Sequence, residues 1–244
     1  AGKSSLVDEI VRRFRMDEGD LAIAILAVDP SKRKTGGALL GDRIRMNAIA
    51  QGVYMRSLAT RDSEAEIPEG LADMIAACKV ADFDLVIVET SGIGQGNAAI
   101  VDHVDVSLYV MTPEFGAASQ LEKIDMLDLA DVVAINKFDR KGAMDALRDV
   151  RKQVQRSRQA FTALPDEMPV FGTIASKFND EGVTALYEGC LELFNLRKLG
   201  SWETCLPPIE TKATQPSTII VPPARQHYLS EISECVRGYL MKVE

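Results

Sequence analysis

A lysine and two serines open the chain in a setting that suits phosphate binding. Gly2, Lys3, Ser4 and Ser5 are followed at once by apolar residues at helical spacing. Backbone N–H groups at a helix N-terminus can surround phosphate oxygens, and Gly2 lets the backbone approach closely. Lys3 would then reach the β- and γ-phosphates, and the Ser4 hydroxyl would ligate Mg²⁺. Taken alone, these residues fit a polar helix cap equally well.

A second group of residues has the chemistry to recognise guanine. Asn136, Lys137, Phe138 and Asp139 follow directly after an apolar run of strand length. The Asp139 carboxylate would accept hydrogen bonds from guanine N1–H and the 2-amino group, a donor pair that adenine lacks. A site built on such hydrogen bonds rejects an analogue that cannot form them. Asn136 and Lys137 would hold the loop and line the base. The alternative is a turn that ends the strand, which the position far downstream of Lys3 disfavours.

Three acidic residues are candidates for a metal site. Glu89 ends another apolar run, at a position where many P-loop proteins carry an acid that helps to hold Mg²⁺. Gly92 follows and would offer a backbone N–H to the γ-phosphate. Asp29 and Asp42 flank a polar, glycine-containing loop and could also approach the metal. The alternative is that Asp29 begins a turn and Asp42 caps the next helix.

A short turn late in the chain could close over the base. Thr173 to Lys177 follow a predicted strand, and a backbone N–H near Ser176 could bond guanine O6. An ordinary turn at the end of a strand explains this segment equally well.

Strand and helix patterns alternate along the chain, which predicts an α/β fold with a mainly parallel sheet and helices on both faces. The predicted strands are 21–28, 53–58, 84–89, 106–111, 131–135 and 169–175. The predicted helices are 5–14, 43–50, 71–80, 120–129, 143–161 and 182–196.

The composition is that of a globular protein. The chain has 244 residues, of which 46% are hydrophobic and 26% charged, and its net charge is −8. This charge, without a basic stripe, argues against a nucleic-acid partner. No apolar run reaches the roughly 18 residues of a membrane span. The four cysteines form no CxxC pair. We therefore expect a cytoplasmic protein with no membrane partner.

The predicted domain organisation is a GTPase-like domain over 1–200, followed by a linker and helix over 201–244. Five prolines fall within 206–223, and the helical pattern resumes at 224–240. A phosphate loop normally follows a buried strand, and the first glycine of its motif also precedes the lysine by several residues. The sequence therefore predicts truncation at both ends.

Several stretches together resemble a known family. Asp29 to Met46, Glu89 to Gly96 and Asn136 to Asp139 resemble the metallochaperone class of P-loop GTPases, which carries a glutamate at the position of Glu89. Within this class, the chain is similar to the chaperones of adenosylcobalamin-dependent acyl-CoA mutases. Residues 56–61, 113–116 and 136–143 resemble the GTPase domain of fused isobutyryl-CoA mutases. The resemblance covers essentially the whole chain.

The resemblance implies a P-loop NTPase fold and a site for GTP or GDP with Mg²⁺. It implies Lys3 as the phosphate lysine and a guanine site of Asn136, Lys137 and Asp139. It also assigns the metal ligands Ser4, Asp29, Asp42 and Glu89. Lys123, in a segment that matches a nucleotide-sensing switch, is predicted to act in hydrolysis together with Lys3 and Glu89. For Lys123 the alternative is an ordinary solvated charge.

The resemblance also implies a partner. GTP binding and hydrolysis would gate the loading of adenosylcobalamin onto an acyl-CoA mutase and the removal of damaged cofactor. The mutase would belong to the same chain, and the full-length protein would form a homodimer. The alternatives are a stand-alone methylmalonyl-CoA mutase chaperone, a nickel-insertion GTPase and a non-hydrolysing GTP-binding module. Two scattered histidines argue against the nickel alternative.

Overall fold

The computed structural model describes residues 2–30, 52–60, 67–90, 99–116, 121–122 and 124–214. All of these belong to one compact unit, Ala1–Thr214. Its strands are β1 (Ile23–Pro30), β2 (Val53–Thr60), β3 (Leu85–Glu89), β4 (Leu108–Met111), β5 (Val132–Asn136) and β6 (Val170–Thr173). Its α-helices are α1 (Lys3–Asp17), α3 (Leu71–Val80), α5 (Met126–Leu129), α6 (Ala143–Ser157) and α7 (Glu181–Leu196). Three short 3-10 helices are η1 (Ala99–His103), η2 (Pro113–Phe115) and η3 (Pro165–Glu167).

The six described strands form two parallel sheets of three strands each. The first sheet has the order β2-β1-β3 and the second the order β4-β5-β6. In the first sheet Ala27 lies opposite Glu89, and in the second Asn136 lies opposite Thr173. Because all pairs are parallel, the carboxyl ends of neighbouring strands meet at one edge of each sheet. The predicted α/β fold is confirmed, with its strands divided between two sheets.

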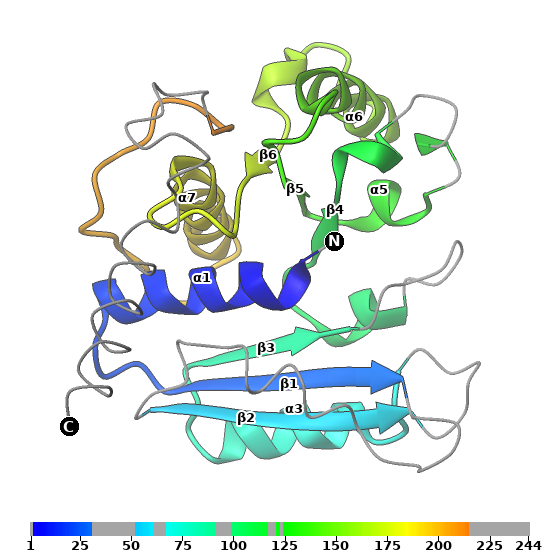
Figure 1. Cartoon of the computed structure of the whole chain (residues 1–244). Helices are drawn as coiled ribbons and strands as arrows, with labels where there is room; N and C mark the ends of the chain where they lie inside the picture. The colour runs from blue at the N-terminus through cyan, green and yellow to red at the C-terminus, as the bar shows by residue number, and fades with distance from the viewer. Residues whose placement is uncertain are drawn as a thin grey trace, which may run out of the picture. The chain divides into compact units, whose positions relative to one another are not determined.

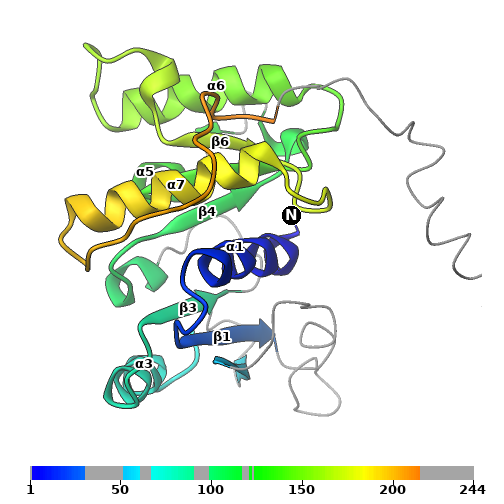
Figure 2. The ribbon, with the colours of Figure 1, turned by 90° about the vertical axis from the view of Figure 1, so that its left-hand side faces the viewer.

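Helices cover both faces of each sheet (Figures 1 and 2). In β1, Ile23, Ile25 and Ala27 pack into a core with α1 and α7, whereas Ala24 and Leu26 pack toward α3. This alternation follows from the two-residue period of a strand. In the second sheet, β5 contributes to the α1 and α7 core and also to a core with α5 and α6. The helix α1 therefore packs against residues of both sheets, and it lies between β3 and α7 in both views.

Several element boundaries differ from the predicted ones. The helix predicted over 143–161 ends at Ser157, because Gln159 adopts the left-handed conformation with φ of 53°. Of the helix predicted over 120–129, the described residues are helical at Leu121 and in α5, a single turn. The predicted helix over 43–50 lies outside the described residues, as does the predicted helix over 224–240. No helix in the described ranges is long and apolar enough to cross a membrane.

Residues 201–214 pack against the rest of the compact unit. The Trp202 ring lies 5.5 Å from that of Phe14 and 5.8 Å from that of Phe194, measured between centroids. Farther on, Gly172 N–H donates to the carbonyl of Lys212 (2.9 Å) and Thr214 N–H donates to the carbonyl of Gly172 (3.0 Å). The segment 212–214 therefore runs along the edge of β6, as a further strand would.

Gly182, in the first turn of α7, marks the tightest backbone approach in this region. A Cβ there would lie 1.9 Å from the carbonyl oxygen of Gly172 and 2.5 Å from Thr214 Oγ1. Gly182→Ala should therefore lower the free energy of unfolding by about 1–3 kcal/mol or more, measured by urea denaturation. Gly19→Ala is the control, since an added methyl group there would meet no described atom within 4 Å. Equal stability of the two variants would contradict this packing.

Candidate functional site

The residues predicted to bind phosphate lie against those predicted to bind the base. Gly2 precedes α1 in the left-handed conformation, with φ of 79°. The Asn136 side-chain amide donates to the Gly2 carbonyl oxygen at 3.4 Å. A Cβ on Gly2 would lie 2.9 Å from Asn136 Nδ2 and 3.9 Å from Lys137 Cε. Glycine is thus required both by its φ and by this close approach. The start of α1 and the end of β5 therefore share one edge of the molecule.

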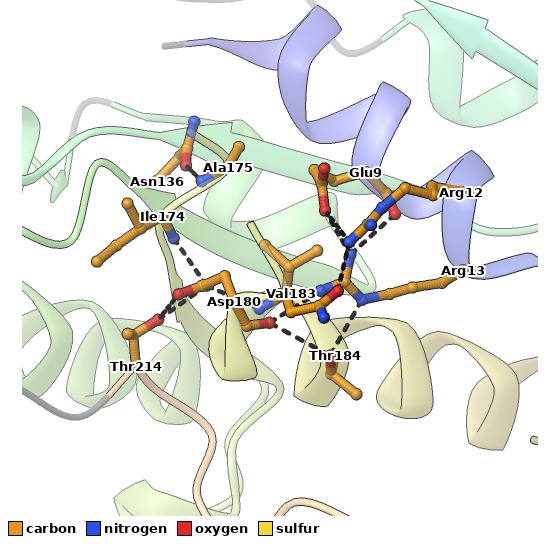
Figure 3. A network of polar contacts seen from close by, with 11 residues as sticks. Glu9, Arg12, Arg13, Asn136, Ile174, Ala175, Asp180, Val183, Thr184 and Thr214 are labelled. Carbon is orange, nitrogen blue, oxygen red and sulfur yellow. Dashed lines mark hydrogen bonds and ion pairs between the residues drawn. The ribbon is translucent and has the colours of Figure 1, made fainter. Parts of the chain in front are cut away.

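Asn136 joins three segments of the chain. It is the last residue of β5 and only 2% exposed. Its side-chain oxygen Oδ1 accepts hydrogen bonds from Ala175 N–H (3.0 Å; Figure 3) and from the Thr173 hydroxyl (3.3 Å). Its side-chain nitrogen Nδ2 donates to the Gly2 carbonyl oxygen. A buried amide satisfied on both sides fixes the positions of all its partners. Asn136 therefore ties the phosphate end of the site to the loop that follows β6.

The turn after Asn136 presents Asp139 at the surface. Lys137 takes a left-handed φ of 60°, and Phe138 N–H donates to the Thr173 carbonyl at 3.0 Å. The Phe138 ring is buried, and a Cβ on Gly172 would lie 2.6 Å from it. These contacts fix the turn on both sides of its apex. The Asp139 side chain is exposed, so its carboxylate is accessible to a ligand.

The loop after β6 leaves one of its first four backbone donors for a ligand. Ile174 N–H donates to Asp180, Ala175 N–H to Asn136, and Lys177 N–H to the Ile174 carbonyl. The backbone N–H of Ser176 donates in none of the described hydrogen bonds of residues 174–177. The sequence predicted a backbone donor near this position.

Two predicted metal ligands are in direct contact. The Ser4 hydroxyl, in the first turn of α1, donates to Glu89 Oε1 at the end of β3 (2.7 Å). Asp29 lies two residues beyond Ala27, the β1 residue opposite Glu89, so its backbone is at the same sheet edge. A hydroxyl and carboxylates are the oxygen ligands that Mg²⁺ prefers. The described residues contain no cluster of three or more His, Cys, Asp or Glu side chains suited to a metal. Ser4 and Glu89 could provide two of the oxygen ligands of a magnesium site.

Other predicted site residues are less fully placed. Lys3 is the first residue of α1, and its side chain is partly buried. Gly92, Asp42 and Lys123 lie outside the described residues, and of Asp29 only the backbone is described.

An open pocket of about 290 Å³ lies between α1 and the loop after β6. Its lining residues are Ser5, Asp8, Glu9, Ala175, Ser176, Lys177 and Phe178. They come from the first turns of α1 and from the loop that contacts Asn136. The pocket therefore borders both the phosphate end and the base end of the predicted site.

Sequence reasoning missed a buried polar network behind this pocket. Arg13 is 2% exposed and Asp180 is 0% exposed, and they meet between α1 and α7 (Figure 3). Asp180 caps α7 by accepting from Val183 N–H (3.1 Å). An Asp at the start of a helical pattern is a recognisable cap signal, and it could have identified Asp180. No sequence signal distinguishes Arg13 from Arg12 and Arg15, the partly exposed arginines of α1.

The chain is similar to several known proteins. The family model described as "Methylmalonyl Co-A mutase-associated GTPase MeaB" matches residues 1–201. The fused isobutyryl-CoA mutase of Cupriavidus metallidurans is 62% identical over 245 residues, which cover 100% of this chain and 22% of that protein. The chain thus spans about a fifth of the length of the fused isobutyryl-CoA mutases that it matches.

Two solved structures share the fold. They are the LAO/AO transport system kinase (TM-score 0.53, 22% identity, 82% of this chain and 58% of that one) and HypB from Helicobacter pylori in complex with nickel (TM-score 0.52, 16% identity, 85% and 86%). At these identities they support the α/β fold alone. The family resemblance predicted from the sequence is confirmed by the family model and the relatives. The chain belongs to the family of methylmalonyl-CoA mutase-associated GTPases called MeaB.

Proposed function

We propose that this chain binds Mg·GTP at the edge shared by α1, β3 and β5 and hydrolyses its γ-phosphate bond. The observation that carries the proposal is the hydrogen bond from the Asn136 side-chain amide to the Gly2 carbonyl oxygen, which joins the phosphate residues to the base residues. A single nucleotide can then meet both groups, and the pocket is lined by Ser5 next to the phosphate residues and by Ser176 of the predicted base turn. The family name, which is that of a GTPase, supports a guanine nucleotide.

At the phosphate end, the backbone N–H groups of the first turn of α1 would bind the phosphates together with Lys3. Ser4 and Glu89 would hold Mg²⁺, with Asp29 and Asp42 as further ligands. When bound, the metal would supply positive charge that stabilises the phosphate oxygens as the bond to the leaving group breaks. Lys3 would stabilise the same charge, and water would attack in line with the leaving oxygen. Gly92 would bind the γ-phosphate, and Lys123 would act as a switch in hydrolysis.

At the base end, Asp139 would accept the two guanine hydrogen bonds while Asn136 and Lys137 keep the loop in place. The N–H of Ser176 would donate to O6. Adenine has an amino group instead of O6 and lacks the N1–H, so it would leave both protein groups without partners. Such a mismatch costs enough free energy to exclude ATP.

The wider role that we propose is control of adenosylcobalamin loading and repair on an acyl-CoA mutase in the same polypeptide. It is supported by the 62% identity to a fused isobutyryl-CoA mutase, of which the matched part is 22%. The full-length protein would act as a homodimer in the cytoplasm, and the mutase would raise a slow intrinsic hydrolysis rate. The name of the matching family keeps a methylmalonyl-CoA mutase as the second candidate partner.

Single-turnover hydrolysis tests the central part of this proposal. With excess full chain over radiolabelled nucleotide, GTP should be converted to GDP and phosphate in the presence of Mg²⁺. ATP should be hydrolysed at least about 100-fold more slowly, because the base site excludes it. Chelation of Mg²⁺ by EDTA should abolish the GTP reaction. Equal rates for the two nucleotides, or a rate insensitive to EDTA, would contradict the proposal.

A further inference from the structure

A single buried carboxylate closes the loop between β6 and α7. We name residues 174–179 the base-facing loop. Directly after it, Asp180 Oδ2 accepts hydrogen bonds from Ile174 N–H (2.9 Å) and from Val183 N–H (3.1 Å), as Figure 3 shows. One side chain therefore joins the first residue of the base-facing loop to the first turn of α7.

The backbone of Asp180 is also attached to α1. Arg13 Nη2 donates to the Asp180 carbonyl oxygen at 2.9 Å, and Arg13 Nε donates to the Thr184 hydroxyl at 3.1 Å. The guanidinium is paired with Glu9 Oε2 at 2.8 Å, so its charge is compensated although it is buried. The helix that carries Lys3 and Ser4 is thereby connected to the end of the base-facing loop.

A neighbouring arginine holds the outer part of the same loop. Arg12 Nη2 donates to Asn179 Oδ1 at 2.7 Å, and the Arg12 guanidinium lies 4.5 Å from the centre of the Phe178 ring. Phe178 is otherwise exposed. Because this tie is at the surface, it is weaker than the buried one through Arg13. The outer part of the loop is therefore held more weakly than its buried end, where Ala175 N–H donates to Asn136 and Ile174 N–H donates to Asp180.

The third attachment of Asp180 comes from the end of the compact unit. Thr214 Oγ1 lies 2.9 Å from Asp180 Oδ1, 2.8 Å from Oδ2 and 3.2 Å from the Gly172 carbonyl oxygen. The shorter distances and the negative charge favour donation of the hydroxyl proton to the carboxylate. Burial raises the pKa of Asp180, while the hydrogen bonds from Ile174, Thr214 and Val183 favour the charged form. Thr214 is the last residue of the unit and belongs to the segment that runs along β6. The segment 212–214 is thus connected to the base-facing loop through one carboxylate.

We propose that Asp180 is a positioning residue for the nucleobase and that Thr214 makes this positioning depend on segment 212–214. Asp180 sets the place of Ile174, and through it the place of the Ser176 N–H that would bond guanine O6. A displacement of segment 212–214 would release the Thr214 hydroxyl and loosen the loop, so guanine affinity would fall. By thermodynamic reciprocity, guanine binding would in turn stabilise the segment in its present place. This inference rests on the guanine site proposed above.

The test compares two nucleotides that differ only at the atom bonded to carbon 6 of the base. GDP has an oxygen at position 6, whereas 6-thio-GDP keeps N1–H and the 2-amino group and has sulfur, a weaker acceptor, at that position. Affinities of the full chain for both would be measured by calorimetry for wild type, Asp180→Asn and Thr214→Val. The control is Thr211→Val, which removes a hydroxyl from the same part of the chain that donates to the Ala213 carbonyl and not to Asp180.

We expect wild type and Thr211→Val to prefer GDP by the same factor. Thr214→Val should bind GDP about 3- to 10-fold more weakly and show a smaller preference over 6-thio-GDP. Asp180→Asn should show a change in the same direction, because it removes the negative charge that accepts the Thr214 hydroxyl. If Asp180→Asn does not fold, Thr214→Val carries the test, because it removes only a hydroxyl at similar volume.

Two results would overturn the inference in distinguishable ways. If Thr214→Val unfolds at a lower temperature but keeps the wild-type preference for GDP over 6-thio-GDP, the network is merely structural. If the wild-type chain binds neither nucleotide, the proposed function itself fails, and the inference fails with it.

Discussion

Asp139→Asn is expected to reverse the base preference of the chain from guanine to xanthine. GTP affinity should fall about 100-fold or more, because the asparagine offers one acceptor where guanine presents two donors. Xanthine carries an oxygen in place of the 2-amino group, so the Asn amide can donate to that oxygen while its carbonyl accepts from N1–H. Titration with GTP and xanthosine triphosphate, followed by calorimetry, measures both affinities directly.

The Asp139 substitution separates recognition from folding. Asp139 is exposed, so the thermal stability of the variant should stay within about 0.5 kcal/mol of wild type. Asp145→Asn on α6 is the matched control: that side chain is 75% exposed and pairs only with Arg148 among the described ion pairs. It should leave both nucleotide affinities unchanged. Undiminished GTP binding by Asp139→Asn, without a gain for xanthosine triphosphate, would remove Asp139 from the base site.

Ser4→Ala and Glu89→Gln are each expected to slow single-turnover GTP hydrolysis about 100-fold or more. The two side chains are 2.7 Å apart and, in the proposed site, provide adjacent oxygen ligands for Mg²⁺. Loss of a metal that supplies several kcal/mol of charge stabilisation gives a rate effect of this size. Glu89→Gln is the sharper variant, because it keeps an acceptor for the Ser4 hydroxyl and removes only the charge.

The dependence on Mg²⁺ distinguishes a ligand role from a structural one. Both variants should need more Mg²⁺ for half-maximal hydrolysis, and saturating Mg²⁺ should recover part of the rate. Ser201→Ala, at an exposed serine outside the site, is the control and should hydrolyse GTP as wild type does. Wild-type rates and an unchanged Mg²⁺ requirement in both variants would show that Ser4 and Glu89 do not hold the metal.

Two contacts of the candidate site could be anticipated in part from the sequence, because parallel strands impose their own geometry. Glu89 and Asn136 follow apolar runs, and such runs end at the carboxyl edge of a buried parallel sheet. Polar residues placed directly after them are therefore gathered at that edge, although they are far apart in the chain. Their partners Ser4 and Gly2 lie instead at the N-terminal end of α1, where they meet these strand ends.

The network around Asp180 could not be predicted in the same way. Arg13 lies on α1 among other charged residues, and only packing against α7 makes it buried. Thr214 follows a proline-containing stretch without periodicity, so no pattern indicates that its hydroxyl meets a carboxylate 34 residues earlier. Contacts of this kind depend on tertiary geometry rather than on local sequence preference.

The division of the strands into two sheets was likewise not foreseen. Apolar runs predict that a strand is buried, but they do not specify its neighbour. β3 and β4 both contribute residues that pack against the core containing α1, although each belongs to a different sheet. The short α5 and the early end of α6 show that helix boundaries depend on local turns such as that at Gln159.

The central claim is that one guanine nucleotide spans the start of α1 and the turn after β5. A crystal structure of the full chain with Mg²⁺ and a non-hydrolysable GTP analogue tests it most directly. We predict a single bound nucleotide, with its phosphates and Mg²⁺ at Lys3, Ser4 and Glu89 and its base at Asp139 and Ser176. A nucleotide whose phosphates lie at Lys3 but whose base points away from Asp139, or one bound elsewhere on the chain, would contradict the account.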